Sequence, residues 1–333
     1  MKIAVLGGGG WGTALAMLLV ENGHEVTLWS YLEEESQRLR ETGENPLLPG
    51  VKLPQGLQYT WDLSCVKDCG AVIMATPSFG VRTTAEQIRP YLTPEIILIS
   101  VSKGIEKGTS LRMTEIIRQA TGDLCPVAAL SGPSHAEEVA RRVPTAVVSA
   151  CPDQVVAEQV QDLFLNDRFR VYSSSDVIGV ELGAALKNVM ALCTGCCRGM
   201  EFGDNTIAML MTRGLAEMAR LGVALGGRRE TFAGLAGMGD LIVTCTSLNS
   251  RNYRAGILIG QGVPVDQAIA QIGAVVEGYY AVDSARELAA RLGVEMPITQ
   301  AAYEVLYEGR SPREALQALM RRKKRHEIEE TWI

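Results

Sequence analysis

The segment spanning residues 1–30 constrains the fold of this chain more than any other. Lys2–Leu6 is a short aliphatic run typical of a buried strand, and four consecutive glycines, Gly7–Gly10, follow it directly. A helical pattern begins at Gly12, and residues 25–29 return to a strand pattern. The segment therefore predicts a strand–helix–strand unit, which is the building block of a parallel α/β sheet.

The spacing of Gly7, Gly9 and Gly12 is the G-x-G-x-x-G spacing of dinucleotide-binding loops. In such a loop the first glycine permits a tight turn, the second lets a pyrophosphate approach, and the third lets the helix lie close to the strand. The helix N-terminus adds free N–H donors and a partial positive charge. The alternative is a turn that binds nothing, but the preceding strand and following helix favour a cofactor site.

Composition and charge narrow the class of protein. The 333 residues suffice for one or two domains with a large core, and the net charge of −6 argues against a general nucleic-acid partner. The basic run Arg321–Arg325 lies next to an acidic stretch, Glu327–Glu330, so we interpret it as a solvated helix end. Met1 leads directly into the first strand, so we expect no export signal. Because no apolar run approaches the roughly 18 residues that a membrane span needs, we also expect no span and a cytoplasmic location.

The eight cysteines are expected to be reduced thiols that serve as small apolar residues. Cys193-x-x-Cys196 is not accompanied by a second pair or a histidine cluster, so we expect no metal site.

Apolar runs continue the sheet as far as residue 173. The loops carrying Ser78, Lys103 and Ser134 each follow such a run, and ligands of open α/β sheets bind at the carboxyl ends of the strands. We therefore expect these loops to converge on the glycine loop. The predicted strands after the first unit are residues 57–60, 71–75, 96–101, 126–130, 145–151 and 169–173.

From about Val177 the pattern becomes helical, so we divide the chain into a dinucleotide-binding domain, residues 1–178, and a helical substrate domain, residues 179–333. No low-complexity linker separates them, and we expect the site to lie between them. The predicted helices are residues 33–42, 180–199, 206–225, 253–261, 265–272, 278–292, 298–307 and 312–321.

A lysine is the best candidate for acid–base chemistry. The histidines are His24 at the wrong end of the sheet, His326 in the tail, and His135, which a helix start explains equally well. A partly buried lysine beside other positive charge can lose its proton near neutral pH. Lys187 interrupts an apolar helix, although a surface lysine is the alternative, and Lys103 is a second candidate or a solvated loop residue.

Two polar stretches of the helical part complete the candidate site. Asp240 stands alone among glycines and apolar residues, with Thr244 one turn later, and it could also be a helix N-cap. Arg251 and Asn252 stand at a predicted helix start, where guanidinium and N–H groups suit a phosphate, with a capping loop as the alternative.

Together these residues closely resemble the soluble NAD(P)-dependent glycerol-3-phosphate dehydrogenases of bacteria. The likeness is an ordered chain of motifs: GGGGWGTALA, ATPS, VSKGIE, LSGPSHAEEVA, IGVELGAALKNV, GLAGMGDLIVTCTSLNSRNY, VVEGYYAV and GVEMPITQAAYEVLY. The resemblance implies a Rossmann-type domain with a mostly parallel sheet, an all-α domain, and a homodimer. It further implies reversible hydride transfer that converts dihydroxyacetone phosphate to sn-glycerol 3-phosphate for glycerophospholipid synthesis.

The resemblance also implies roles for individual residues. Lys187 would be the catalytic acid and base, assisted by Asn188 and Thr244. The small phosphorylated substrate would be held by Lys103, Gly132, Ser134, Lys187, Asp240, Ser250, Arg251 and Asn252. The cofactor would be bound by Gly7, Gly9, Gly10, Trp11, Gly12, Tyr31, Lys103, Ala136, Arg251, Val275 and Glu277.

The chain departs from the family pattern at two places. The glycine loop has Gly8 and Gly10 at the variable positions, which loosens the loop without removing a donor. The second strand ends without the acidic residue that binds the ribose hydroxyls of NAD, so NADP is slightly favoured over NAD. The alternatives are a β-hydroxyacid dehydrogenase or ketopantoate reductase, which typically has K-x-x-x-N rather than adjacent Lys187-Asn188, and a non-catalytic dinucleotide sensor.

Overall fold

The structure is a computed structural model that describes residues 1–324, 326 and 327. Its contacts divide the chain into two compact units, Met1–Glu181 and Leu182–Ile333. This division falls three residues after the boundary at 178 that the composition suggests, because the first turns of one long helix pack with the first unit.

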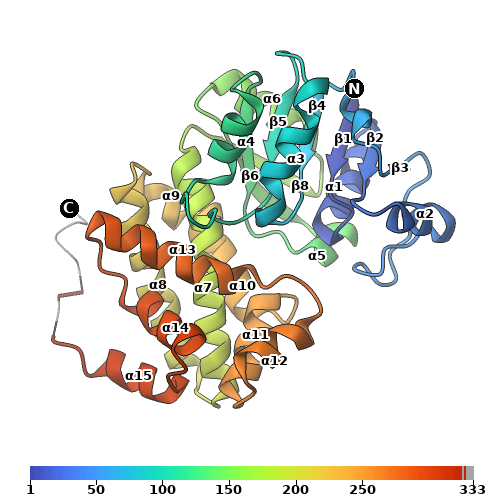
Figure 1. Ribbon diagram of the computed structural model, residues 1–333. Helices are drawn as coiled ribbons and strands as arrows, with labels where there is room; N and C mark the ends of the chain where they lie inside the picture. The colour runs from blue at the N-terminus through green and yellow to red at the C-terminus, as the bar shows by residue number, and fades with distance from the viewer. Residues whose placement is uncertain (325, 328–333) are drawn as a thin grey trace. The chain divides into compact units, whose positions relative to one another are not determined.

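The first unit contains an eight-stranded sheet with the order β3-β2-β1-β4-β5-β6-β7-β8 (Figure 1). All neighbouring strands are parallel except β6 and β7, which confirms the predicted mostly parallel sheet. Every predicted strand is present, with ends that differ by at most one residue. The strands are β1 (Lys2–Leu6), β2 (Glu25–Trp29), β3 (Gln58–Thr60), β4 (Ala71–Met74), β5 (Ile97–Ser100), β6 (Val127–Ser131), β7 (Thr145–Ala150) and β8 (Phe169–Ser174).

Alternating side chains of the strands form two separate apolar cores, one on each face of the sheet. In β1, Ile3 and Val5 join the core under α1, α5 and α6, whereas Ala4 and Leu6 join the core under α3 and α4. The sequence analysis did not assign α3, α4, α5 or α6. The helices of this unit are α1 (Gly10–Glu21), α2 (Glu33–Thr42), α3 (Val81–Ile88), α4 (Met113–Thr121), α5 (Ala136–Ala140) and α6 (Gln154–Phe164).

The second unit is helical throughout the residues that the structure describes, as predicted. The long helix α7 (Val177–Gly199) crosses from the first unit and packs among the other helices of the second (Figure 1). The others are α8 (Asp204–Ala224), α9 (Arg229–Ala233), α10 (Asp240–Thr246), α11 (Arg251–Gly260), α12 (Val265–Ile272), α13 (Glu277–Leu292), α14 (Pro297–Tyr307) and α15 (Pro312–Met320).

Close backbone contacts hold α7 in this unit. A Cβ atom on Gly195 of α7 would lie 2.2 Å from the carbonyl oxygen of Tyr253 in α11. Reciprocally, a Cβ atom on Gly256 of α11 would lie 2.2 Å from the carbonyl oxygen of Leu192 in α7. Only glycine permits two helix backbones to approach this closely, so these positions fix the crossing of α7 and α11.

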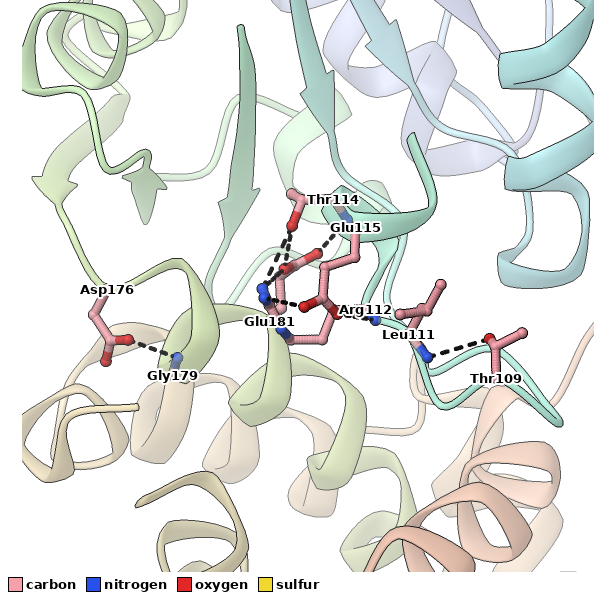
Figure 2. A network of polar contacts seen from close by, with 8 residues as sticks. All are labelled: Thr109, Leu111, Arg112, Thr114, Glu115, Asp176, Gly179 and Glu181. Atoms are coloured by element: carbon pink, nitrogen blue, oxygen red, sulfur yellow. Dashed lines mark hydrogen bonds and ion pairs between the residues drawn. The ribbon is translucent and has the colours of Figure 1, made fainter. Parts of the chain in front are cut away.

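A buried polar network fixes the first turns of α7 within the first unit (Figure 2). The Glu181 carboxylate accepts hydrogen bonds from the Thr114 backbone N–H at 2.8 Å, the Thr114 hydroxyl at 2.6 Å and the Arg112 guanidinium at 2.5 Å. Burial raises the pKa of Glu181, while Arg112 and Thr114 oppose that increase. The network ties α7 to the residues that begin α4.

By length and composition alone, α7 could cross a membrane, and it is the one such helix among the described residues. However, 89% of its most apolar window is buried inside the structure, as in the core helix of a globular protein. Its apolar composition is therefore weak evidence for a span. The basic run begins directly after α15. Its last residue, Arg325, and residues 328–330 of the acidic stretch lie outside the described residues.

Candidate functional site

The glycine loop between β1 and α1 has the backbone that a dinucleotide loop requires. Gly7 has φ of +136°, and a Cβ atom there would lie 2.5 Å from the Ala75 carbonyl oxygen. A Cβ atom on Gly12 would lie 2.0 Å from the carbonyl oxygen of Gly7, so α1 packs directly against the loop. Around Gly9, by contrast, nothing lies within 4 Å of an added Cβ. This open space lies beside the N-terminus of α1, and it fits an approaching pyrophosphate.

Several other cofactor candidates surround the N-terminus of α1. A Cβ atom on Gly10 would lie 3.7 Å from the Cβ of Ala136, the first residue of α5. Trp11 is half-buried, and its indole Nε1 is a buried donor with no protein partner. Tyr31 stands apart from this group: it is 78% exposed and contacts Trp29 edge-on, with ring centroids 6.2 Å apart.

Lys103, Gly132 and Ser134 meet at a single carbonyl group. Lys103 follows β5, and the other two follow β6, the parallel neighbour of β5. The Lys103 ammonium donates to the Gly132 carbonyl oxygen at 3.2 Å, and the Ser134 hydroxyl donates to the same oxygen at 3.0 Å. Sheet order thus brings together two loops that the sequence separates by about 30 residues.

Ser78 also follows a strand of this edge, as expected. It begins a short 3-10 helix, Ser78–Gly80, after β4, which lies between β1 and β5 in the sheet. His135 is the residue before α5, and His24 lies in the turn between α1 and β2, where burial lowers its pKa.

The second unit buries a lysine–aspartate pair. Lys187, in the middle of α7, is only 6% exposed, and Asp240, the first residue of α10, is 1% exposed. The Lys187 ammonium lies 2.9 Å from Asp240 Oδ1 and donates to the Thr244 hydroxyl at 2.6 Å. The Thr244 hydroxyl in turn donates to the Asp240 backbone carbonyl at 2.5 Å. Three candidates from two helices therefore form one buried cluster.

This cluster differs from the sequence expectation in one respect. The sequence analysis expected positive charge near the lysine, whereas the Lys187 ammonium forms an ion pair with the Asp240 carboxylate. An opposite charge favours the ammonium form, so the Asp240 carboxylate stabilises the charged state of Lys187.

A π-helical turn precedes Asp240. Residues Leu235–Gly239 form this turn, and the Gly239 N–H donates to the Gly234 carbonyl oxygen at 3.1 Å. π-Turns are rare and frequently occur at functional sites. The glycine-rich sequence before Asp240 was the visible signal, but the sequence analysis predicted no π-helix.

Two asparagines link α7, α11 and α13. The Asn252 amide donates to Asn188 Oδ1 at 3.0 Å and accepts from the Gly278 backbone N–H at 2.8 Å. Ser250 caps α11, because its hydroxyl accepts from the Tyr253 N–H at 3.2 Å. The helix starts at Arg251, which is exposed, so a guanidinium and a helix N-terminus lie side by side as the sequence predicts.

Val275 and Glu277 flank the start of α13. Glu277 is the first residue of the helix, and both side chains are half-buried. Glu277 directly precedes Gly278, whose backbone N–H donates to Asn252 Oδ1.

Sequence reasoning missed two buried polar residues of the first unit. Asn45 donates to the glycine loop, and Glu181 holds the first turns of α7. For Asn45 the sequence contains only a polar residue before Pro46 in a loop, which is a weak signal.

The cysteines of this chain are unpaired with one another. All eight cysteines are free thiols, and burial raises the pKa of Cys196 to about 12 and that of Cys197 to about 11. These thiols are therefore protonated and apolar at neutral pH. Across the described residues, no group of three or more His, Cys, Asp and Glu side chains could hold a metal ion.

Comparison with known proteins gives one consistent family. The profile described as NAD-dependent glycerol-3-phosphate dehydrogenase N-terminus matches residues 2–157, and the corresponding C-terminus profile matches residues 176–317. A relative from Moorella thermoacetica, named glycerol-3-phosphate dehydrogenase [NAD(P)+], is 51% identical over 330 residues, 98% of both chains. A relative of the same name from Geobacillus kaustophilus is 49% identical over 333 residues, 99% of this chain and 97% of the relative.

Solved structures agree with this result. The structure of glycerol-3-phosphate dehydrogenase from Coxiella burnetii has a TM-score of 0.93 and 38% identity, covering 96% of this chain and 99% of that one. A ketopantoate reductase structure from Ralstonia eutropha has a TM-score of 0.62 at 16% identity, covering 95% of this chain and all of that one, so it shares the fold alone.

Proposed function

This chain belongs to the NAD-dependent glycerol-3-phosphate dehydrogenase family, and we propose that it catalyses the reversible reduction of dihydroxyacetone phosphate to sn-glycerol 3-phosphate with NADH or NADPH. The observation that carries the proposed chemistry is the buried Lys187 ammonium, 2.9 Å from Asp240 and 2.6 Å from Thr244. A lysine so deeply buried in an apolar helix needs a reason, and proton transfer provides one.

The cofactor is held by the glycine loop and the residues around it. The open space at Gly9 and the N-terminus of α1 receive the pyrophosphate, and Trp11 offers its unpartnered indole N–H nearby. When bound, the nicotinamide supplies the hydride for reduction and accepts it in oxidation. The further cofactor contacts are Gly7, Gly10, Gly12, Tyr31, Lys103, Ala136, Arg251, Val275 and Glu277.

Lys187 serves as the acid in reduction and the base in oxidation. As the central carbonyl carbon is reduced, its oxygen gains negative charge, and the Lys187 ammonium donates a proton to it. Asp240 keeps the lysine charged before the reaction, and Thr244 orients the Nζ atom. In oxidation, the neutral amine of Lys187 removes the proton from the alcohol.

The substrate phosphate is held at the start of α11. The Arg251 guanidinium provides charge, and the N–H groups of the helix N-terminus provide donors. Asn252 is fixed by Asn188 and Gly278, so its position is defined before substrate binds. Lys103, Gly132, Ser134, Asp240 and Ser250 complete the substrate contacts.

We assign residues 1–178 to the dinucleotide-binding domain and residues 179–333 to the helical domain that carries Lys187, with each domain adding a few contacts to the other's ligand. Serine and tyrosine stand where an acidic residue would select NAD, which favours NADP slightly. The ratio of kcat/KM for NADPH to that for NADH tests this preference. Family membership also supports a cytoplasmic homodimer whose product feeds glycerophospholipid synthesis.

The decisive experiment measures NADH and NADPH oxidation by the purified protein with dihydroxyacetone phosphate. Lys187→Ala should lower kcat by roughly 10²- to 10⁴-fold while cofactor still binds. Lys67→Ala, at an exposed lysine of the first unit, is the matched control. An unimpaired Lys187→Ala enzyme would refute the assigned acid–base role.

A substrate panel separates the alternatives. Turnover of ketopantoate or an unphosphorylated β-hydroxyacid, but not of dihydroxyacetone phosphate, would favour the related reductases. Binding of NADH without turnover of any ketone would indicate a dinucleotide sensor.

A further inference from the structure

The glycine loop needs a restraint from outside its own sequence if it is to be ordered before a ligand binds. Residues 7–10 are all glycine, and glycine loses more backbone conformational freedom on ordering than any other residue type. A loop that must be ordered by its ligand binds that ligand more weakly. A stiffer residue at Gly8 would require the buried Ser30 side chain to shift, since a Cβ atom there would lie 2.2 Å from Ser30 Oγ.

Asn45, outside the loop, supplies the missing restraint. This side chain is 3% exposed, and its amide nitrogen donates to the Gly8 carbonyl oxygen at 2.9 Å and to the Thr13 hydroxyl at 2.7 Å. Thr13 is fully buried in the first turns of α1, and its own hydroxyl donates to the Gly8 carbonyl oxygen at 3.3 Å. The three groups form a closed ring of hydrogen bonds that joins loop and helix.

The loop that carries Asn45 is itself anchored. The Leu48 N–H donates to the Asn45 carbonyl oxygen at 2.8 Å, and the Leu48 side chain is 1% exposed in the core that α1 also covers. The Leu47 N–H donates to Asn45 Oδ1 at 3.0 Å, which fixes the orientation of the amide. The Cβ and carbonyl oxygen of Leu47 each lie 3.6 Å from where a Cβ on Gly10 would stand. Asn45 thus positions both the glycine loop and the residue that faces it.

We propose that Asn45 is a positioning residue that holds the four-glycine loop in its binding conformation before the dinucleotide arrives. The inference rests on the proposed function, because it assumes that this loop receives the cofactor pyrophosphate. Asn45 touches no reacting atom in this proposal. Its contribution is to reduce the ordering cost of binding, so its loss weakens cofactor affinity and leaves the chemical step intact.

The test is Asn45→Asp in the full-length protein, with NADH binding measured by fluorescence titration. The introduced carboxylate still accepts from the Leu47 N–H, but it cannot donate to the Gly8 carbonyl oxygen. We expect the Kd for NADH to rise roughly tenfold, as for loss of a buried hydrogen bond, with kcat at saturating NADH nearly unchanged. Amide hydrogen exchange from Gly8 to Thr13 should accelerate.

The pH profile and a matched control distinguish positioning from general damage. Burial at this site should raise the pKa of the introduced carboxyl, and its protonation restores a donor. The Kd ratio of variant to wild type should therefore shrink as the pH falls from about 8 toward about 5. Asn22→Asp removes a comparable amide donor, to the Leu163 carbonyl oxygen at 2.8 Å, from the opposite end of α1. This control should leave the Kd unchanged.

The outcomes separate the two proposals. If Asn45→Asp does not fold, Thr13→Val decides, because it removes the hydroxyl from the ring and should also raise the Kd. Unchanged affinity in both folded variants, or a fall in kcat without a change in Kd, would overturn the role of Asn45. Failure of the wild-type protein to bind NADH or NADPH would instead overturn the proposed function.

Discussion

Glu217 should make the stability of the helical unit depend on pH in the direction opposite to that of a salt-bridged acid. This residue of α8 is 2% exposed, and its carboxylate caps the start of α14. It accepts from the Ile298 N–H at 2.7 Å and from the Thr299 N–H at 3.3 Å. Burial nevertheless dominates and raises the pKa of Glu217 from 4.5 to about 7, although Arg220 and Arg322 oppose the shift.

Proton linkage gives the direction and the size of the effect of Glu217 on the free energy of unfolding. Between the two pKa values the folded state holds a proton that the unfolded state has released, so folding is stabilised at low pH. This stabilisation is complete below about pH 4.5 and is lost as the pH rises through about 7. Since one pH unit corresponds to about 1.4 kcal/mol, the contribution is roughly 3 kcal/mol.

The assay compares wild type with Glu217→Gln by urea unfolding, followed by circular dichroism, from about pH 4.5 to about pH 8. The glutamine is neutral throughout, and other titrating groups cancel in the difference. The free energy of unfolding of wild type should therefore fall by roughly 3 kcal/mol relative to the variant as the pH rises. Glu287→Gln, at an exposed residue of α13, is the control. Parallel pH profiles for wild type and Glu217→Gln would refute the reasoning.

Three further substitutions test the buried contacts. Asp240→Asn leaves the buried Lys187 ammonium without its carboxylate, and it should lower the free energy of unfolding by about 3 to 5 kcal/mol. Arg112→Leu removes the ionic partner of the buried Glu181 carboxylate and should lower the free energy of unfolding by a similar amount. The additional change Glu181→Leu should partly restore that stability. Gly256→Ala places a Cβ against the α7 backbone and should cost about 3 kcal/mol or more. Each is measured by urea unfolding of the purified variant.

Matched controls accompany these substitutions. Asp204→Asn breaks an exposed pair with Arg198 and should cost no more than about 1 kcal/mol. Gly203→Ala adds a methyl group where nothing lies within 4 Å and should also change stability by less than about 1 kcal/mol. Equal losses in the test and control variants would contradict the assigned contacts.

The sheet could be predicted from sequence because each of its strands carries a local signal. Continuous apolar runs such as Ala71–Met74 are typical of strands buried on both faces, and each ends at a polar loop. The antiparallel pairing of β6 with β7 carries no such signal, because register and direction are decided between strands. Helices such as α3 were missed because they are only a few turns long and partly polar.

The long helices of the second unit were also predictable, but their close approach was not. An alanine- and leucine-rich pattern indicates the helix α7, whereas nothing local distinguishes Gly195 from a neutral small residue. Its necessity follows only from the partner backbone at Tyr253.

In the candidate site, too, single residues could be predicted from the sequence, but the contacts between them could not. The sequence could indicate Lys187 and Asp240 separately, since each is a charged residue in an apolar segment. It could not indicate that the two pair, because 53 positions and a π-turn separate them, and that pairing replaced the expected positive surroundings of Lys187 with a negative one. Asn45 is the stronger case: its side chain looks like an ordinary loop residue until the fold places it against Gly8. Residues that bind a ligand leave chemical patterns in the sequence, whereas residues that hold those binding groups in place are recognised only through the contacts they make.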